Sequence, residues 1–135
     1  MIYKFTEIND VELKTDLKGS FFSSEWLTIF KDGRIIIKGS NKNGYSWDGC
    51  SPKFKIFGKI VGTPDGKNLG DYPETYFASM LHDVLYQHKK FIDFSRLDVD
   101  LQFKRDLEKV NFKHTDIYYF FVRKFGKLYG IWKIK

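Results

Sequence analysis

The chain has 135 residues, a formal net charge of +6 and an aromatic content of 19%. A chain of this length can bury a hydrophobic core as one domain, and its aromatic content is well above that of disordered proteins. Its single cysteine, Cys50, excludes an internal disulfide framework, and no stretch has the roughly 18–20 apolar residues of a membrane span.

The charge and the first residues indicate the setting in which the protein works. Lysine far outnumbers arginine, which is more typical of a solvated surface than of a nucleic-acid interface, so we expect no nucleic-acid partner. Residues 1–7 lack the basic region and apolar run of a signal peptide. We therefore expect a soluble, intracellular protein without a transmembrane segment, and the oligomeric state stays open.

The N-terminal part of the chain predicts strands. Residues 1–20 have a few alternating apolar positions, which indicate a short edge strand or a loose arm. Residues 26–30 and 34–38 are rich in β-branched and aromatic side chains and flank the Asp32-Gly33 turn. This arrangement is a strong hairpin signal, because glycine accepts the positive φ that a tight turn needs.

The segments that follow predict a further strand, an alternating segment and a loop. The strand begins at Tyr45 and ends by Gly49, before Pro52. Residues 54–61 alternate around a glycine, and the Gly-rich residues 62–71 predict a loop.

Residues 73–87 predict a helix, with Pro73 in its first turn. The apolar residues of this segment recur at helical spacing: Phe77, Met80, Leu81, Val84 and Leu85. A second helix is expected from Asp93 or Ser95, both good N-caps, to about Val110.

A third helix, aromatic on several sides, is expected at residues 115–128, and residues 129–135 predict a last strand or packed coil. Strands first and helices afterwards predict an α+β fold. We expect one domain, 1–135, with an N-terminal antiparallel β-hairpin or small sheet followed by three helices, the first two an antiparallel pair.

His82 and Asp100 are the candidate catalytic pair. They lie at similar distances from the short connection between the first two helices, so in an antiparallel pair they can meet. A buried carboxylate fixes the tautomer of an imidazole and stabilises its protonated form. Such a histidine is a general base that can activate water.

Asp83 points about 100° away from His82 on the same helix, so it predicts a different role. Together with carbonyl oxygens of a Gly-rich loop, it could bind a hard cation such as calcium. The loop that contains Asp48 and Gly49 and the loop that contains Asp65 are both candidates, and the sequence does not decide between them.

The motif His82-Asp83-x-x-Tyr86, followed by Asp100-Leu101-Gln102-Phe103, resembles the histidine–aspartate core of the phospholipase A2 superfamily. The resemblance is closer to the disulfide-free phospholipase domain of parvovirus minor capsid proteins. It implies that His82 is the base, Asp100 its orienting partner, Asp83 a calcium ligand and Tyr86 part of the supporting hydrogen bonds.

A longer part of the chain, about residues 44–126, resembles an uncharacterised family of small phage and prophage proteins. Four motifs carry this resemblance: Trp47-Asp48-Gly49-Cys50-Ser51-Pro52, Ala78-Ser79-x-x-His82-Asp83-x-x-Tyr86-Gln87, Arg96-x-x-x-Asp100-x-x-Phe103 and Tyr118-x-x-x-Val122-Arg123-x-Phe125-Gly126. It implies a phage source, and hence a protein in the host cytoplasm or associated with the virion, but no settled activity.

Several candidate residues also have ordinary structural interpretations. Asp100 lies one helical turn from Arg96, a candidate supporting residue, and also from Lys104. Asp98 is the second choice for the carboxylate, and Arg123 either holds a phosphate or complements the helix dipole.

Other residues are expected to be structural. We expect Asp48 and Asp65 to be turn residues if they bind no metal, His88 and His114 to lie at the surface, and the aromatic third helix to be core. A histidine–aspartate metal phosphohydrolase is disfavoured, because it needs a histidine upstream of His82 and the chain has none.

The sequence leaves two functions open. The first is a small phage-type hydrolase in which His82 and Asp100 activate water, with a phospholipid or another ester as substrate and calcium as a possible cofactor. The second is a non-enzymatic phage accessory protein that binds a host or virion protein, including one that counteracts host defence.

Overall fold

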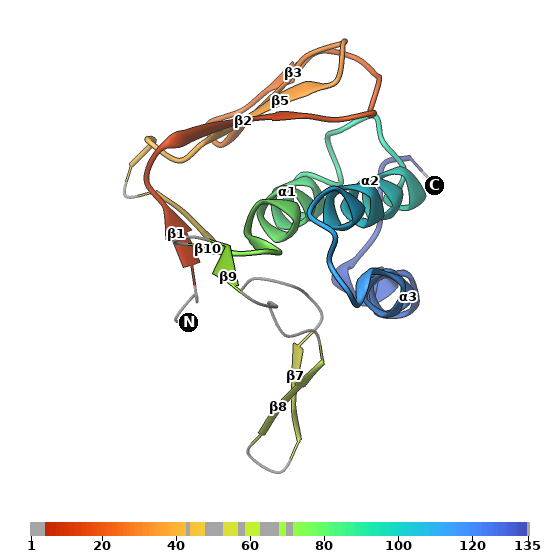
Figure 1. Ribbon diagram of the computed structural model, residues 1–135. Coiled ribbons are helices and arrows are strands. Elements are labelled where there is room, and N and C mark those ends of the chain that lie inside the picture. The colour runs from red at the N-terminus through yellow and green to blue at the C-terminus, as the bar shows by residue number, and fades with distance from the viewer. Residues whose placement is uncertain are drawn as a thin grey trace.

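The computed structural model describes residues 5–42, 44–47, 53–56, 59–62, 68–69 and 72–134 (Figure 1). Short strands come first and three α-helices follow, so the α+β fold is confirmed. The strands are β1 (Phe5–Glu7), β2 (Asp10–Lys14), β3 (Phe22–Ser23), β4 (Leu27–Ile29), β5 (Arg34–Lys38), β6 (Tyr45–Trp47), β7 (Lys53–Ile56), β8 (Lys59–Gly62), β9 (Asn68–Leu69) and β10 (Tyr72–Pro73). The helices are α1 (Tyr76–Gln87), α2 (Arg96–Lys109) and α3 (Thr115–Phe125), with a 3₁₀ turn, η1 (Gly126–Tyr129), after α3.

The main sheet is antiparallel, with the strand order β2-β5-β4-β3. The predicted hairpin is confirmed, since β4 pairs with β5 in the register Leu27↔Ile37 and Ile29↔Ile35. These four side chains are fully or almost fully buried, which gives the sheet one apolar face. Gly33 provides the turn with a φ of +96°.

The N-terminal 20 residues contribute to two sheets. β2 is an edge strand of the main sheet, as one of the two alternatives predicted, whereas β1 pairs with β6 in a separate ribbon. β7 pairs with β8 and β9 with β10, so residues 68–69 of the expected loop are in a short strand.

Helix α1 begins at Tyr76, later than predicted, because Pro73 is paired with Asn68 in the β9–β10 ribbon. Helix α2 begins after Ser95, as predicted. The backbone N–H of Asp98 donates to the Ser95 hydroxyl at 3.0 Å, and the Ser95 N–H donates to the Asp98 carboxylate at 3.1 Å. This reciprocal capping box defines the start of the helix.

The antiparallel pair α1–α2 lies between the main sheet and α3 (Figure 1). The sheet and α1 share the larger hydrophobic cluster, whereas α2 and α3 share a smaller one around Phe103, Leu107 and Tyr118. No helix in the described part of the chain is long and apolar enough to cross a membrane.

The prediction that α3 is a core helix is confirmed on one side only, where Tyr118 and Val122 lie in the smaller hydrophobic cluster. Only Thr115, Tyr118 and Val122 are buried on α3, and Ile117 and Phe120 are exposed. The C-terminal tail forms no strand in its described residues, but Ile134 makes one parallel bridge to Ser95, and Trp132 is buried.

We predict that Gly33→Ala destabilises the protein more than Gly130→Ala does. Both glycines have a positive φ, +96° and +114°, which costs an alanine about 1–3 kcal/mol. A Cβ atom at Gly33 would also overlap the Thr15 carbonyl oxygen, whereas at Gly130 it would lie 3.0 Å from the flexible Lys89 side chain. Urea unfolding measures both losses, and equal losses would contradict the assigned turn geometry.

Candidate functional site

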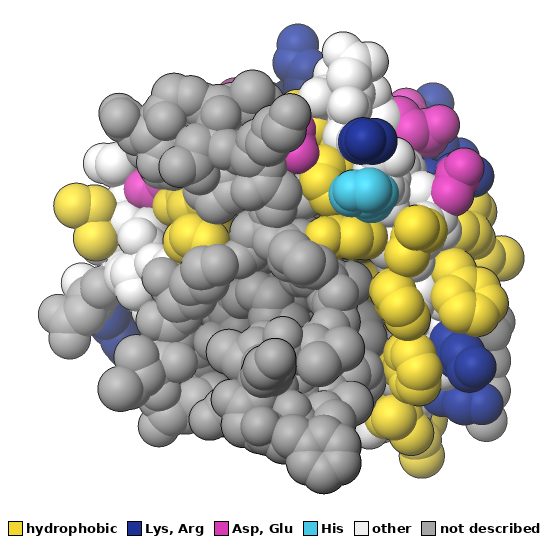
Figure 2. Space-filling model, turned by 60° about the horizontal axis from the view of Figure 1, so that its bottom comes forward, with side chains coloured by type: hydrophobic (Ala, Val, Ile, Leu, Met, Phe, Trp, Pro, Cys, Tyr) yellow, Lys and Arg dark blue, Asp and Glu magenta, His cyan; other side chains and the backbone are white. Residues whose placement is uncertain are grey.

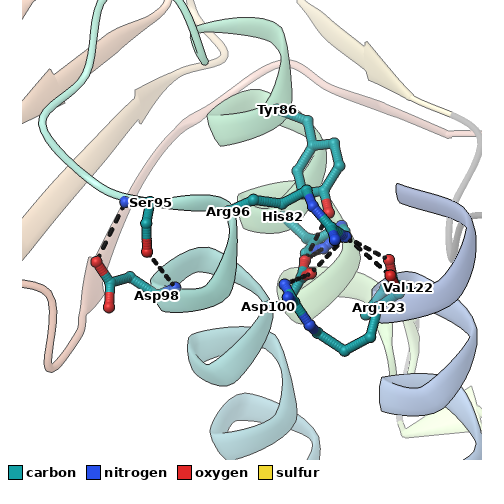
Figure 3. Close-up of polar contacts among 8 residues, drawn as sticks. All are labelled: His82, Tyr86, Ser95, Arg96, Asp98, Asp100, Val122 and Arg123. Atoms are coloured by element: carbon teal, nitrogen blue, oxygen red, sulfur yellow. Dashed lines mark hydrogen bonds and ion pairs between the residues drawn. The ribbon is translucent and has the colours of Figure 1, made fainter. Parts of the chain in front are cut away.

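His82 lies on the side of α1 that faces α2. Its Nε2 donates to Oδ1 of Asp100 across the helix pair at 2.8 Å (Figure 3). The contact expected from the sequence is therefore present. The pair lies between the two hydrophobic clusters, since the His82 ring packs against Tyr86 of the larger cluster and Phe103 of the smaller one.

Asp100 is the centre of a larger network. Its side chain is 0% exposed, and it accepts four hydrogen bonds from three helices. Oδ1 accepts from His82 and from the Tyr86 hydroxyl at 2.6 Å, and Oδ2 accepts from Arg96 at 3.2 Å and Arg123 at 2.8 Å. A buried carboxylate with this many donors is well compensated.

The surroundings of Asp100 hold it in its ionised form. Burial favours the neutral acid, but the hydrogen bond and charge of His82, and then the hydrogen bonds from Tyr86 and Arg123, outweigh burial and lower the pKa of Asp100. Burial, followed by the charge of Asp100, raises the pKa of Tyr86. The Tyr86 hydroxyl therefore keeps its proton and acts as a donor.

Arg96 and Arg123 connect α3 to this network. Besides Asp100, Arg96 donates to the backbone carbonyls of Val122 and Arg123 at 3.0 and 3.1 Å. Gly126 permits this close approach, because a Cβ atom there would overlap the Tyr86 hydroxyl and lie 2.8 Å from Arg96. Arg123 thus binds the Asp100 carboxylate, a role that neither of the sequence interpretations proposed.

The two ring nitrogens of His82 differ in their surroundings. The side chain is 7% exposed, with ring centroids 4.3 Å from Tyr86 and 4.6 Å from Phe103. Nε2 is bonded to Asp100, whereas the described residues give Nδ1 no hydrogen-bond partner. Among the described residues, the one polar side-chain atom both sealed from solvent and unbonded is Trp132 Nε1, so Nδ1 is not completely enclosed.

Asp83 lies apart from the His82–Asp100 network, as the helix geometry predicted. Its Oδ2 accepts from the Tyr45 hydroxyl at 2.6 Å and from the Gln87 side chain at 2.9 Å. Asp48, Gly49 and Asp65, the other predicted metal-site residues, lie outside the described residues. Within the described ranges no three His, Cys, Asp or Glu side chains form a metal-binding group.

The remaining candidates have structural roles. Asp98 belongs to the capping box of α2, which makes Asp100 the carboxylate partner of His82. The prediction of a surface His88 is wrong, because it is buried, donates from Nδ1 to the Val84 carbonyl at 2.8 Å and bonds Ser24 through Nε2 at 3.0 Å. His114 is exposed, as expected.

No family model, curated protein or solved structure matches the chain.

Asp106, one and a half turns beyond Asp100 on α2, has the opposite electrostatic environment. It accepts from the Gln102 amide at 2.9 Å, and Gln102 in turn accepts from the backbone of Asp16 at 2.8 Å. Burial raises the pKa of Asp106 to about 6, against the lowering effect of the Gln102 hydrogen bond. In the described structure no arginine forms an ion pair with the Asp106 carboxylate, and the Lys109 Nζ atom lies 3.9 Å from Asp106 Oδ1.

We predict that Asp100→Asn lowers the free energy of unfolding by about 3–5 kcal/mol at pH 7, since it removes a fully buried anion from four hydrogen-bond donors, two of them partly exposed guanidinium groups. Asp98→Asn, at the exposed cap, is the control and should cost about 1 kcal/mol or less. Because the pKa of Asp100 is lowered, its contribution is present above about pH 4 and is lost at lower pH, where the wild type and Asp100→Asn should converge. Urea unfolding over a pH series measures this, and a loss below 1 kcal/mol at pH 7 would contradict the network.

We predict that Asp106→Asn stabilises the protein at neutral pH. The pKa of about 6 means that the folded state binds the proton more tightly than the unfolded state does, so stability falls as the pH rises from about 4 to 6. Asparagine keeps the acceptor for Gln102 and removes this loss, which amounts to at most about 3 kcal/mol. Thermal unfolding at pH 4 and pH 7 measures the change, with the exposed Asp116→Asn as control. An unchanged pH dependence in Asp106→Asn would exclude this assignment.

Proposed function

We propose that the protein is a small phage-type hydrolase in which His82 acts as the general base. The observation that supports this most is the asymmetry of the His82 ring. Nε2 is bonded to an ionised, fully buried carboxylate, and Nδ1 has no partner among the described residues and is not completely enclosed. This is the arrangement that an imidazole needs to take a proton from water.

The proposed reaction is the hydrolysis of an ester. Nδ1 of His82 removes a proton from a water molecule as the water oxygen bonds to the ester carbonyl carbon. Asp100 stabilises the imidazolium that forms, and its own proton-free state is maintained by Tyr86, Arg96 and Arg123. The proton then passes from Nδ1 to the leaving alkoxide as the carbon–oxygen bond breaks, which gives an acid and an alcohol.

A phospholipid ester is the substrate that we propose. It is supported by the spacing of His82, Tyr86 and Asp100, which resembles the phospholipase A2 core and here brings the three side chains together. The same resemblance is the reason for proposing calcium, with Asp83 as a ligand. When bound, calcium would polarise the ester carbonyl. Among the described residues Asp83 accepts hydrogen bonds from Tyr45 and Gln87, and no step above depends on the metal.

A second candidate is the non-enzymatic phage accessory protein that binds a host or virion protein. It is supported by the two arginines on Asp100 and by the small exposed fraction of His82. In this case the network has the single task of holding the three helices together. The protein would then have no turnover, whereas the stability effects of Asp100 substitutions would be the same.

We predict that His82→Gln lowers phospholipid hydrolysis about 10²–10⁴-fold, the usual contribution of a general base. The control is His114→Gln, which changes an exposed histidine and should keep the wild-type rate. Release of fatty acid from phosphatidylglycerol vesicles measures the rate, in calcium and in chelator. Loss of wild-type activity in chelator would support the calcium assignment, and activity that persists would remove it.

Two outcomes of this experiment count against the hydrolase. If His82→Gln hydrolyses vesicles at the wild-type rate, His82 is not the base. If the folded wild type hydrolyses neither phospholipid nor simple carboxylic esters, the accessory protein becomes the better account.

A further inference from the structure

The outer side of α3 is apolar although it is not packed against the rest of the protein. Thr115, Tyr118 and Val122 form its buried side. On the opposite side Ile117 and Phe120 are 52% and 56% exposed, and Leu128 in η1 is 71% exposed. Ile117, Phe120 and Leu128 together span about three turns, with Lys124 between Phe120 and Leu128.

The apolar surface continues beyond the helix. Of the eleven exposed large hydrophobic residues in the described part of the chain, six lie between Ile117 and Ile134. Figure 2 shows hydrophobic side chains gathered along the right side of the molecule, where α3 lies in Figure 1, with Lys and Arg side chains among them. Exposed apolar residues gathered in this way usually mark an interaction site.

The charge of this region identifies the kind of partner. Residues 111–135 contain six Lys or Arg and one acidic residue, Asp116. Arg123 is paired with Asp100 and Lys133 with Asp93, whereas Lys124 and Lys127 follow the exposed Phe120 along the chain. The Lys124 ammonium group lies 5.6 Å and 5.7 Å from the ring centres of Phe120 and Phe125. A lysine can keep its stem on apolar surface while its charge reaches the polar headgroups.

We propose that the face made by Ile117, Phe120, Lys124, Lys127 and Leu128 docks on an anionic lipid surface, with α3 lying in the plane of the membrane interface. Phenylalanine and leucine on one side of a short helix, with lysines beside them, are the composition of an interfacial helix. An acidic headgroup layer matches both the apolar and the basic part of this face. The proposal does not depend on catalysis by His82.

The experiment is co-sedimentation of the full chain with vesicles, in chelator so that calcium plays no part. Wild type should bind phosphatidylglycerol vesicles more tightly than phosphatidylcholine vesicles, and added salt should weaken the binding. His82→Gln should bind as wild type does. Failure of the hydrolase proposal would therefore leave this result unchanged, and failure of binding would leave hydrolysis of soluble esters unchanged.

Two sets of variants test the face itself. Phe120→Ser should lower the affinity about tenfold or more, whereas Phe21→Ser should not, although Phe21 is also 56% exposed. Lys124→Gln with Lys127→Gln should lower the affinity about thirtyfold, since each lysine near an anionic surface contributes about a fivefold factor. Circular dichroism checks that the variants are folded.

Three results would overturn the proposal. The first is no binding of wild type to phosphatidylglycerol vesicles. The second is binding that Phe120→Ser and Phe21→Ser weaken equally. The third is a dimer in solution without lipid that Phe120→Ser dissociates, which would assign the face to a second copy of the chain.

Discussion

The buried carboxylate of Asp100 is the constraint on which the arrangement of the helices depends. A carboxylate removed from water is costly unless donors surround it, and here the donors come from α1, α2 and α3. Arg96 extends the constraint, because it also holds the carbonyls at the C-terminal end of α3. Moving any of the three helices would leave a charge or a donor unpaired, so the network fixes their relative positions.

The same network of hydrogen bonds determines which reactions His82 can take part in. Because Asp100 is ionised and oriented by Tyr86 and the arginines, it can bind His82 through Nε2. The Nδ1 atom is then not needed for this contact and can accept a proton. The arginines also share the negative charge, which would moderate the effect of Asp100 on the imidazole. A hydrolase and a purely structural network thus use the same hydrogen bonds and differ in whether Nδ1 accepts a proton from water.

Much of the fold follows from local signals in the sequence. The Asp32-Gly33 hairpin and the Ser95 cap depend on a few adjacent residues, and both are present as predicted. The contact between His82 and Asp100 could be predicted from the periodicity of the two helices and the short connection between them. Arg123 could not be placed in this way, because its contact depends on how α3 crosses the other helices. The exposed side of α3 differs from the prediction for a related reason, since a periodic apolar stripe predicts a helix face but not which neighbour covers it.

The most direct test of this account is the protonation of the His82 ring, measured by ¹⁵N NMR at pH 8 in the wild type and in Asp100→Asn. We expect the wild-type ring to carry one proton, on Nε2, and this preference to weaken when the carboxylate becomes an amide. A wild-type ring with its single proton on Nδ1 would contradict the assignment of Nδ1 as the base.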